Sequence, residues 1–242
     1  MRDRLGKSWD EVWKGLRESA QRCYLSPAVY AQYQVALPLM RQHLRGEMID
    51  LGCGDMPFKP LLADRVSVYH SLDLWPRSGE VTYVGDIGDM AMVPSARYDS
   101  AICLEVLEHV PQPFQAACEI YRVLKPGGTV ILSVPHLSRL HDEPHDYFRF
   151  TAHGLRQVLL NAGFVVLGVH KRGGLFSFLG HQASTLLVSA AWPVPGLRQL
   201  VWLLNKWLIT RLCYWADGVF DPAGLFALGY VAVARKPDAG VG

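Results

Sequence analysis

Residues 48–55, Met-Ile-Asp-Leu-Gly-Cys-Gly-Asp, combine an apolar run with a turn that contains two glycines. The apolar run predicts a buried strand that leads into the turn. Gly52 and Gly54 let the backbone bend sharply and approach a ligand closely, which residues with a Cβ would obstruct. Because a single Gly-x-Gly also occurs in ordinary strand-to-helix turns, this turn needs support from the residues that follow it.

Acidic residues at the ends of the next strands give that support. Asp73, in Ser-Leu-Asp-Leu, lies about twenty residues beyond the turn, where a carboxylate can accept hydrogen bonds from both hydroxyls of a ribose. Asp86, in Val-Gly-Asp-Ile, ends the third strand and can accept from an adenine amino group, and Glu105 follows the fourth strand. Polar groups at four successive strand ends indicate one ligand-binding crevice.

Four histidines lie within eighteen residues, at positions 136, 141, 145 and 153. Histidine is the usual general base near neutral pH, so His136 and His145, together with Glu105, are the candidate catalytic residues. The competing interpretation is that these histidines are solvated or bonded to neighbouring acids. A further alternative is a metal site, because Glu105, Glu108 and His109 share one face of a helical turn and His145 could complete a mixed oxygen and nitrogen shell. The prediction assigns no metal and leaves that alternative open.

The elements that must position these residues follow a rhythm of short apolar runs and helical stretches, which is typical of parallel βαβ units. The predicted strands are residues 47–51, 68–72, 81–84, 100–104, 129–134, 164–170 and 227–234. The predicted helices are residues 57–63, 113–124 and 152–161, after an N-terminal helical segment over residues 8–45 with a capping box at Ser8 and Glu11.

The motifs in this order resemble those of class I S-adenosylmethionine-dependent methyltransferases of the type 11 kind, over about residues 46–171 and the last strand. The resemblance implies an α/β, Rossmann-like fold with a seven-stranded, mostly parallel sheet of order 3-2-1-4-5-7-6, in which strand 7 is antiparallel. It also implies S-adenosyl-L-methionine as the cofactor. The cofactor-binding residues it implies are Asp50, Gly52, Cys53, Gly54, Asp73, Leu74, Asp86, Ile87, Leu104 and Glu105.

The resemblance assigns these residues to parts of the cofactor. Asp50 and the two glycines would shape the space for its amino-acid part, Asp73 would hold the ribose, and Asp86 with the Ile87 amide would meet the adenine. The common Asp-x-Gly-x-Gly-x-Gly pattern is broken at Met56, which precedes Pro57, so a tighter turn with Pro57 as the first helical residue is expected. A nicotinamide dehydrogenase requires Gly-x-Gly-x-x-Gly, and Pro57 at the third glycine position disfavours it.

One interval, Gly173 to Pro222, interrupts the rhythm and is predicted as a helical insertion between strands 6 and 7 of a single domain, placed as a lid or substrate element. Residues 197–216 can form a helix with Leu200, Leu203, Leu204, Trp207 and Leu208 on one arc and Arg198, Gln199, Asn205, Lys206 and Thr210 on the other. This pattern fits a helix at a membrane interface. A buried helical cap and a homodimer interface are the alternatives.

The charge is +2 over the whole chain, but residues 147–216 contain seven Lys and Arg and no Asp or Glu. The low net charge makes nucleic acid an unlikely partner, and the basic half predicts an apolar, anionic acceptor or an anionic surface that presents it. Five scattered cysteines without a Cys-x-x-Cys spacing, and no signal peptide in the first forty residues, predict a cytoplasmic protein, with peripheral contact at the inner membrane face through residues 173–216 as an option.

These observations predict an enzyme that transfers a methyl group to an oxygen of a small molecule or lipid-linked sugar, with nitrogen and carbon as less favoured acceptors. The alternatives are a metal-assisted RNA or quinone-type O-methyltransferase, since such enzymes look similar around Glu105 to His109, and a non-catalytic membrane-surface scaffold with the same fold.

Overall fold

The computed structural model describes residues 11–12, 14–16, 19, 21–77 and 80–240. Two compact units make up the chain. The core unit comprises Ala36–Lys171 and Gly229–Gly242, and the helical unit comprises Met1–Val35 and Arg172–Leu228.

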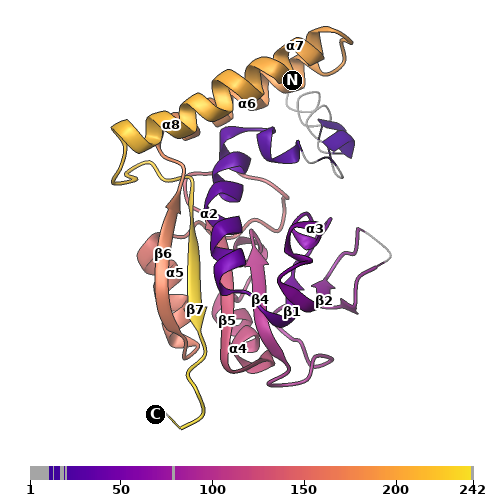
Figure 1. Ribbon diagram of the computed structural model, residues 1–242, viewed down its shortest axis with the longest axis vertical. Helices are drawn as coiled ribbons and strands as arrows, with labels where there is room; N and C mark the ends of the chain where they lie inside the picture. Colours follow the sequence, from indigo (N-terminus) through magenta and orange to yellow (C-terminus); the bar gives the residue numbers. More distant parts are fainter. Residues whose placement is uncertain (1–10, 13, 17–18, 20, 78–79, 241–242) are drawn as a thin grey trace. The chain divides into compact units, whose positions relative to one another are not determined.

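The core unit is built on a seven-stranded sheet of order β3-β2-β1-β4-β5-β7-β6, which confirms the predicted order (Figure 1). Strand β7 pairs antiparallel with β5, as predicted, whereas β1, β2, β3, β4 and β5 are joined by parallel pairs. The strands are β1 (Gly46–Leu51), β2 (Val66–Asp73), β3 (Tyr83–Val84), β4 (Tyr98–Leu104), β5 (Leu124–Pro135), β6 (Val165–Arg172) and β7 (Gly229–Arg235).

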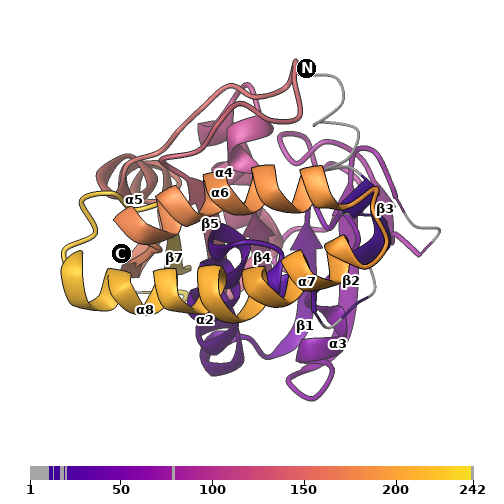
Figure 2. The same ribbon diagram turned by 90° about the horizontal axis from the view of Figure 1, so that it is seen from above.

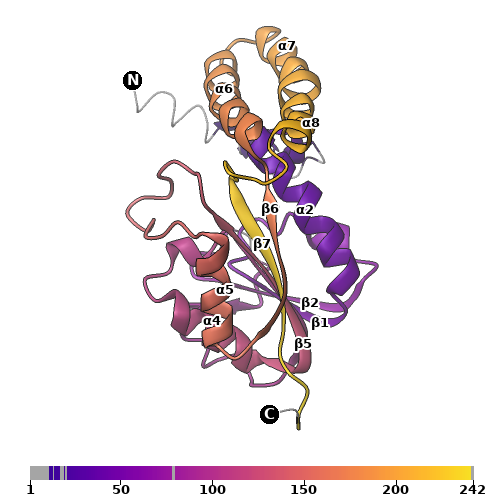
Figure 3. The same ribbon diagram turned by 90° about the vertical axis from the view of Figure 1, so that its left-hand side faces the viewer.

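Helices cover both faces of this sheet. Helices α4 (Pro113–Val123) and α5 (Ala152–Asn161) lie together on one face, and the part of α2 (Pro27–His43) that follows Val35 lies on the other (Figure 3). The central strands are therefore buried on both sides and are almost continuously apolar, as β4 shows with its fully buried run from Ala101 to Cys103. Their carboxyl ends meet at one edge, so this core fixes the residues that follow each strand.

A capping side chain and the positions of prolines and turns determine where the helices of the core unit begin. Thr151 caps α5, because its Oγ1 accepts a hydrogen bond of 3.0 Å from the backbone N–H of Gly154. The short helix α3 (Lys59–Leu62) begins two residues later than predicted, with Pro60 rather than Pro57 in its first turn. The helix begins later because residues 53–58 form turns.

The N-terminal helical segment predicted over residues 8–45 is not one helix. Among the described residues, the chain is helical near residues 11–16, forms the 3-10 turn η1 (Arg22–Tyr24) and then starts α2 afresh at Pro27. Proline has no N–H to donate and disfavours helical backbone in the residue before it, which explains a boundary at this position. The predicted cap at Ser8 lies outside the described residues.

The helical unit consists mainly of α6 (Leu175–Ala191), α7 (Leu197–Leu204), the π-helix η3 (Asn205–Thr210) and α8 (Arg211–Phe220). The last three form one continuous rod, which lies beside α6 (Figure 2). Asp217 on α8 caps α6, since its carboxylate accepts hydrogen bonds from the backbone N–H groups of Phe176 and Ser177 at 2.7 and 3.2 Å. The insertion does not build its core alone, because Leu16 and Leu25 pack in the same apolar cluster as Val188.

Candidate active site

The glycine turn after β1 is held by the neighbouring strand. The backbone N–H groups of Gly52 and Cys53 both donate to the carbonyl of Leu72, at 2.8 and 3.2 Å. Gly52 has φ +68°, and a Cβ there would lie 2.4 Å from Cγ2 of Val106, so only glycine fits. Gly54 has φ +51°, and no described atom lies within 4 Å of where its Cβ would be. The turn is therefore rigid on its inner side and open beside Gly54.

Asp73 at the end of β2 is oriented by two backbone amides. Gly54 N–H donates to Asp73 Oδ2 and Trp75 N–H donates to Asp73 Oδ1, both at 2.8 Å. Two such hydrogen bonds, one to each carboxylate oxygen, hold the side chain in one orientation. The predicted ribose acceptor is thus tied directly to the predicted glycine turn.

Asp50 in β1 is buried, and its carboxylate accepts a hydrogen bond from the hydroxyl of Tyr69 on β2. Burial raises the pKa of Asp50 from 3.8 to about 7, while the Tyr69 hydrogen bond lowers it and the nearby Asp73 carboxylate raises it. Burial and the charges of Asp50 and Asp73 also raise the pKa of Cys53 to about 12. Cys53 is therefore a neutral thiol and not a nucleophile.

Met56 takes the position that a third glycine holds in the common pattern. Its φ is +50°, in the left-handed region that glycine adopts without strain, and its side chain is buried. The backbone N–H of Met56 donates to the carbonyl of Cys53 at 2.8 Å and closes the turn. Met56 is therefore a left-handed residue of this turn, and the helix begins after Pro57, contrary to the expectation that Pro57 is its first residue.

The remaining predicted cofactor residues lie at the same edge of the sheet. The backbone N–H of Gly85, just after β3, donates to the carbonyl of Asp73 at 3.2 Å, which brings the chain before Asp86 to the end of β2. Asp86 Oδ1 accepts from the N–H of Gly88 at 2.7 Å, and Ile87 is buried. Leu74 is 43% exposed, as a residue that contacts a flat ligand ring would be. Leu104 is the last residue of β4.

Glu105 follows β4 with a φ of +55°, a backbone conformation that residues with a side chain adopt only when their surroundings impose it. The surroundings here are β5: Glu105 N–H donates to the carbonyl of Ser133 at 3.0 Å, and the Ser133 hydroxyl donates to Glu105 Oε1 at 2.9 Å. Strained non-glycine residues are concentrated at functional sites, which supports the prediction for Glu105.

The ring of His145 packs against Trp75, at the edge of the sheet where the predicted cofactor residues lie. The two rings are 5.1 Å apart between centroids, and Trp75 is the residue whose N–H donates to Asp73. On its other side, His145 Nδ1 is 3.1 Å from the hydroxyl of Tyr147. When Nδ1 carries the proton and donates to Tyr147, Nε2 is left as an acceptor, which is the state that a general base needs.

A second cluster lies beside this one. The ligand atoms of Glu108, His109 and His141 all lie within 4.8 Å of one another, and Glu108 is fully buried. His109 Nδ1 is 2.6 Å from the carbonyl of His145, so Nδ1 carries the proton and Nε2, 3.7 Å from Glu108 Oε1, is free to bind a cation. The candidate cation ligands therefore include His141. The alternative that the sequence left open instead included the Glu105 carboxylate and the His145 ring, which here contact Ser133 and Tyr147.

Arg149 fixes the loop that carries these histidines. Its guanidinium forms a bidentate ion pair with Asp146, at 2.6 and 2.7 Å, and also donates to the carbonyls of Ser138 and Arg139. These hydrogen bonds hold the pKa of Asp146 far below its usual value. Arg149 therefore fixes this loop through its ion pair with Asp146.

His136 follows β5, with its ring 5.6 Å from that of Tyr230 on β7.

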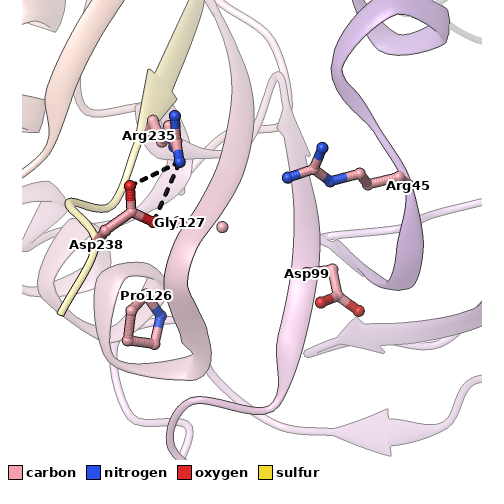
Figure 4. A pocket seen from close by; sticks show the side chains of 7 residues that line it. Arg45, Asp99, Pro126, Gly127, Arg235 and Asp238 are labelled. Atoms are coloured by element: carbon pink, nitrogen blue, oxygen red, sulfur yellow. Dashed lines mark hydrogen bonds and ion pairs between the residues drawn. The ribbon is translucent and has the colours of Figure 1, made fainter.

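A small pocket of about 120 Å³ lies at the opposite end of the sheet, between Arg45, Asp99 and the start of β5 (Figure 4). Arg235, on its other side, is paired with Asp238 at 2.9 Å. Crevices outside the carboxyl ends of parallel strands hold ligands in this class of sheet, so this pocket is not the cofactor site.

Sequence reasoning missed three residues of the site: Tyr69, Trp75 and Tyr147. Tyr69 is an aromatic residue in the middle of an otherwise ordinary strand, and no spacing rule connects it with Asp50. Trp75 is two residues beyond Asp73, and an exposed Trp directly after an acidic strand end is a signal that could have been used. Tyr147 is two residues beyond His145, and no spacing rule connects the two side chains.

Comparison with known proteins agrees with this geometry. Residues 49–132 match the family model of a methyltransferase domain, Methyltransf_11. The ubiquinone biosynthesis O-methyltransferase of Xanthomonas campestris is 32% identical over 117 residues, which cover 43% of this chain and 46% of that protein. The enzyme of the same name from Pseudomonas syringae is 30% identical over 100 residues, which cover 36% and 43%. The chain thus spans about half the length of the curated relatives it matches.

Solved structures with the same fold cover more of the chain. A SAM-dependent methyltransferase from Archaeoglobus fulgidus has a TM-score of 0.53 at 16% identity, over 86% of this chain and 93% of that one. The [4+2]-cyclase SpnF has a TM-score of 0.57 at 20% identity, over 84% and 81%. At these identities the likeness shows the fold alone, and the cyclase illustrates that one fold carries different reactions.

The sheet order is that of the class I methyltransferase fold, and residues 49–132 of the core unit resemble the methyltransferase domain of enzymes whose cofactor is S-adenosyl-L-methionine. The residues fit that cofactor: the space beside Gly54 is open, and the oriented Asp73 carboxylate lies at its rim. Both the fold and the cofactor are those that the sequence motifs predicted.

Proposed function

We propose that this protein transfers a methyl group from S-adenosylmethionine to an oxygen atom of a small-molecule or lipid-linked acceptor, with His145 as the general base. The contact chain from Gly54 through Asp73 and Trp75 to His145 carries the proposal. It brings a group that can accept a proton next to the residues that would hold the methyl donor. The names of the ubiquinone biosynthesis relatives support an oxygen acceptor.

Methyl transfer mainly requires the protein to position the acceptor relative to the methyl donor. S-adenosylmethionine supplies a methyl group already activated by the positive charge on sulfur. The chain has to hold the acceptor in line with that carbon and accept the hydroxyl proton, which His145 Nε2 can do when Nδ1 donates to Tyr147. The exposed aromatic side chains of Trp75 and Tyr147 lie on either side of this histidine, and Phe148 contacts Tyr147, so flat apolar surface is offered to an acceptor.

Two measurements test the proposal in sequence. Calorimetry with S-adenosylhomocysteine should show binding that Asp73→Ala abolishes and that Asp64→Ala, a change at an exposed acid paired with Arg41, leaves intact. If the wild-type protein does not bind, or if Asp73→Ala binds equally well, the enzyme proposal fails and the non-catalytic scaffold remains.

Methyl transfer from radiolabelled S-adenosylmethionine to a panel of phenols and lipid-linked sugars then tests the role of His145. His145→Ala should lower kcat about 10²- to 10⁴-fold, the usual contribution of a general base, with little change in S-adenosylhomocysteine affinity. His153→Ala, at an exposed histidine on α5, is the matched control and should retain full activity. Equal activity of both variants would exclude His145 as the base.

The cluster of Glu108, His109 and His141 favours a second candidate function, in which a divalent cation helps to bind or activate the acceptor oxygen. The arrangement of His109, with Nδ1 held by a backbone carbonyl and Nε2 toward Glu108, is the one that metal-binding histidines adopt. Calorimetric titration with Mg²⁺, Mn²⁺ and Zn²⁺ tests it: His141→Ala should lose the binding and His145→Ala should keep it. A protein that binds none of the three ions, and whose activity is unchanged by a chelator, would exclude it.

A further inference from the structure

Large apolar side chains that are exposed to solvent are concentrated in the helical unit. More than half of those in the described chain fall within residues 172–228, which are about a quarter of the sequence. Along α7 and η3, Leu203 is 54% exposed, Trp207 58% and Leu208 54%. The apolar arc that the sequence predicts for this helix therefore points outward.

Two polar residues of the opposite arc are buried, whereas Arg198 and Gln199 on the same arc are exposed. Asn205 and Thr210 have no exposed surface, and the amide of Asn205 donates to the carbonyls of Tyr24 and Leu25, each at 2.9 Å. Rotating the rod to bury its leucines would break these hydrogen bonds in an apolar interior. The outward orientation of the apolar arc is thus built into the unit, and this arc does not serve as a buried cap.

The charges around the arc are basic. Residues 173–216 contain no Asp or Glu, and the next two acids, Asp217 and Asp221, are buried and accept hydrogen bonds from backbone amides. The Arg211 guanidinium lies 3.8 Å from the centroid of the Trp207 ring, and the Lys206 ammonium lies 5.6 Å from it. Indole rings next to cations, beside exposed leucines, are the composition of a membrane interface.

From these observations we propose that the helical unit lies on a membrane surface rich in anionic lipid, with its apolar face inserted among the lipid chains and its cations at the headgroups. The apolar face comprises Leu200, Leu203, Leu204, Trp207, Leu208 and Trp215. No helix in the described part of the chain is long and apolar enough to cross a bilayer, so the contact is interfacial. A lipid surface fits better than a second copy of the chain, because two copies would bring Lys206 and Arg211 together without an acid to pair them.

Flotation with vesicles tests this surface. The wild-type protein should float with vesicles of phosphatidylcholine and phosphatidylglycerol, and at least tenfold less with phosphatidylcholine alone. Leu203→Glu combined with Leu208→Glu should abolish flotation, since both side chains are exposed and the fold does not need them. Leu160→Glu, at a leucine that is 44% exposed on α5 of the core unit, is the matched control and should float like the wild type.

A second pair of measurements separates the contributions. Arg198→Gln with Lys206→Gln should weaken binding to anionic vesicles several-fold, and the Trp emission should shift to the blue on binding because Trp207 and Trp215 enter an apolar medium. A protein that binds no vesicle, or binds neutral and anionic vesicles equally, overturns the proposal. A dimer in light scattering that Leu203→Glu with Leu208→Glu dissociates, without vesicle binding, assigns the face to a second copy instead. Methyl transfer to a water-soluble acceptor does not enter these outcomes, so the surface and the proposed function fail independently.

Discussion

In β4 of the core unit, Ala101, Ile102 and Cys103 are fully buried, whereas in the rod of the helical unit Leu200 and Leu208 are more than half exposed and Asn205 is fully buried. Both regions are rich in apolar residues, but β4 directs them into the core and the rod directs its leucines to solvent. The comparison teaches that an apolar pattern identifies a face of a helix or strand but not what covers that face. In the core unit the cover is the rest of the fold. In the rod of the helical unit the leucines stay exposed, while Asn205 makes internal hydrogen bonds.

The largest expected difference between the units is in the cost of removing an apolar side chain. Ile102→Ala should lower the free energy of unfolding by about 2–5 kcal/mol, because it leaves a cavity in a packed sheet. Leu208→Ala should change it by less than about 0.5 kcal/mol, because the side chain is already in water. Urea unfolding followed by circular dichroism measures both, and equal costs would remove the distinction between the units.

The converse holds for a buried polar side chain in the helical unit. Asn205→Leu should destabilise that unit by about 2–3 kcal/mol, since the carbonyls of Tyr24 and Leu25 would lose their donors inside the protein. Trp fluorescence emission during unfolding measures the stability of the helical unit. The unit contains Trp192, Trp202, Trp207 and Trp215. Leu204→Ala, next to it on the exposed side, is the control, and a larger effect there than at Asn205 would contradict the inverted arrangement.

Asp50 is an ionisable side chain that is buried in the core unit, and its effect on stability depends on pH. Its raised pKa of about 7 means that between about pH 4 and pH 7 the folded protein keeps a proton that the unfolded chain has lost, so Asp50 lowers stability as the pH rises through that interval. Asp50→Asn should remove this slope and gain on the order of 4 kcal/mol relative to the wild type between pH 4 and pH 7.

Urea midpoints of the two proteins across that interval measure the difference. A constant difference between them would mean that Asp50 is already ionised at pH 4. Tyr69→Phe is an informative companion, because losing the donor that favours the ionised carboxylate should move the slope to higher pH.

At the glycine turn we expect a small change in stability and a larger change in ligand binding. Gly54→Ala should cost only about 1 kcal/mol, the strain of a side chain at φ +51°, because the added methyl meets no described atom. Its effect on the ligand should be larger: affinity for S-adenosylhomocysteine should fall at least tenfold if the open space beside Gly54 receives the cofactor. Unfolding and calorimetry on the same variant test the two parts, and an unchanged affinity would place the cofactor elsewhere.

Much of the core unit could be predicted because its information is local. The apolar runs at residues 47–51 and 100–104 match β1 and β4 within two residues, and the motifs after them indicated the sheet order. The glycine turn and Asp73 meet as expected, since both follow neighbouring parallel strands.

The rest depends on loop paths, which no periodicity describes. One alternative left open by the sequence grouped His145 with Glu105, Glu108 and His109. In the structure the ring of His141 lies beside Glu108 and His109, and the ring of His145 packs on Trp75. Likewise the two arcs of residues 197–216 were predicted, but not that the apolar one faces outward, because that depends on Tyr24 and Leu25 far away in the chain.

That distance has a consequence for how the protein is made. Asn205 bonds to carbonyls 180 and 181 residues earlier in the chain, and the cluster around Leu25 needs Val188 to be complete. During synthesis from the N-terminus, the segment before Ala36 therefore waits for its partners until nearly the whole sheet-forming sequence has left the ribosome. Closing so long a loop is slow, so the helical unit should be the last part of the molecule to become protected from hydrogen exchange in a refolding experiment.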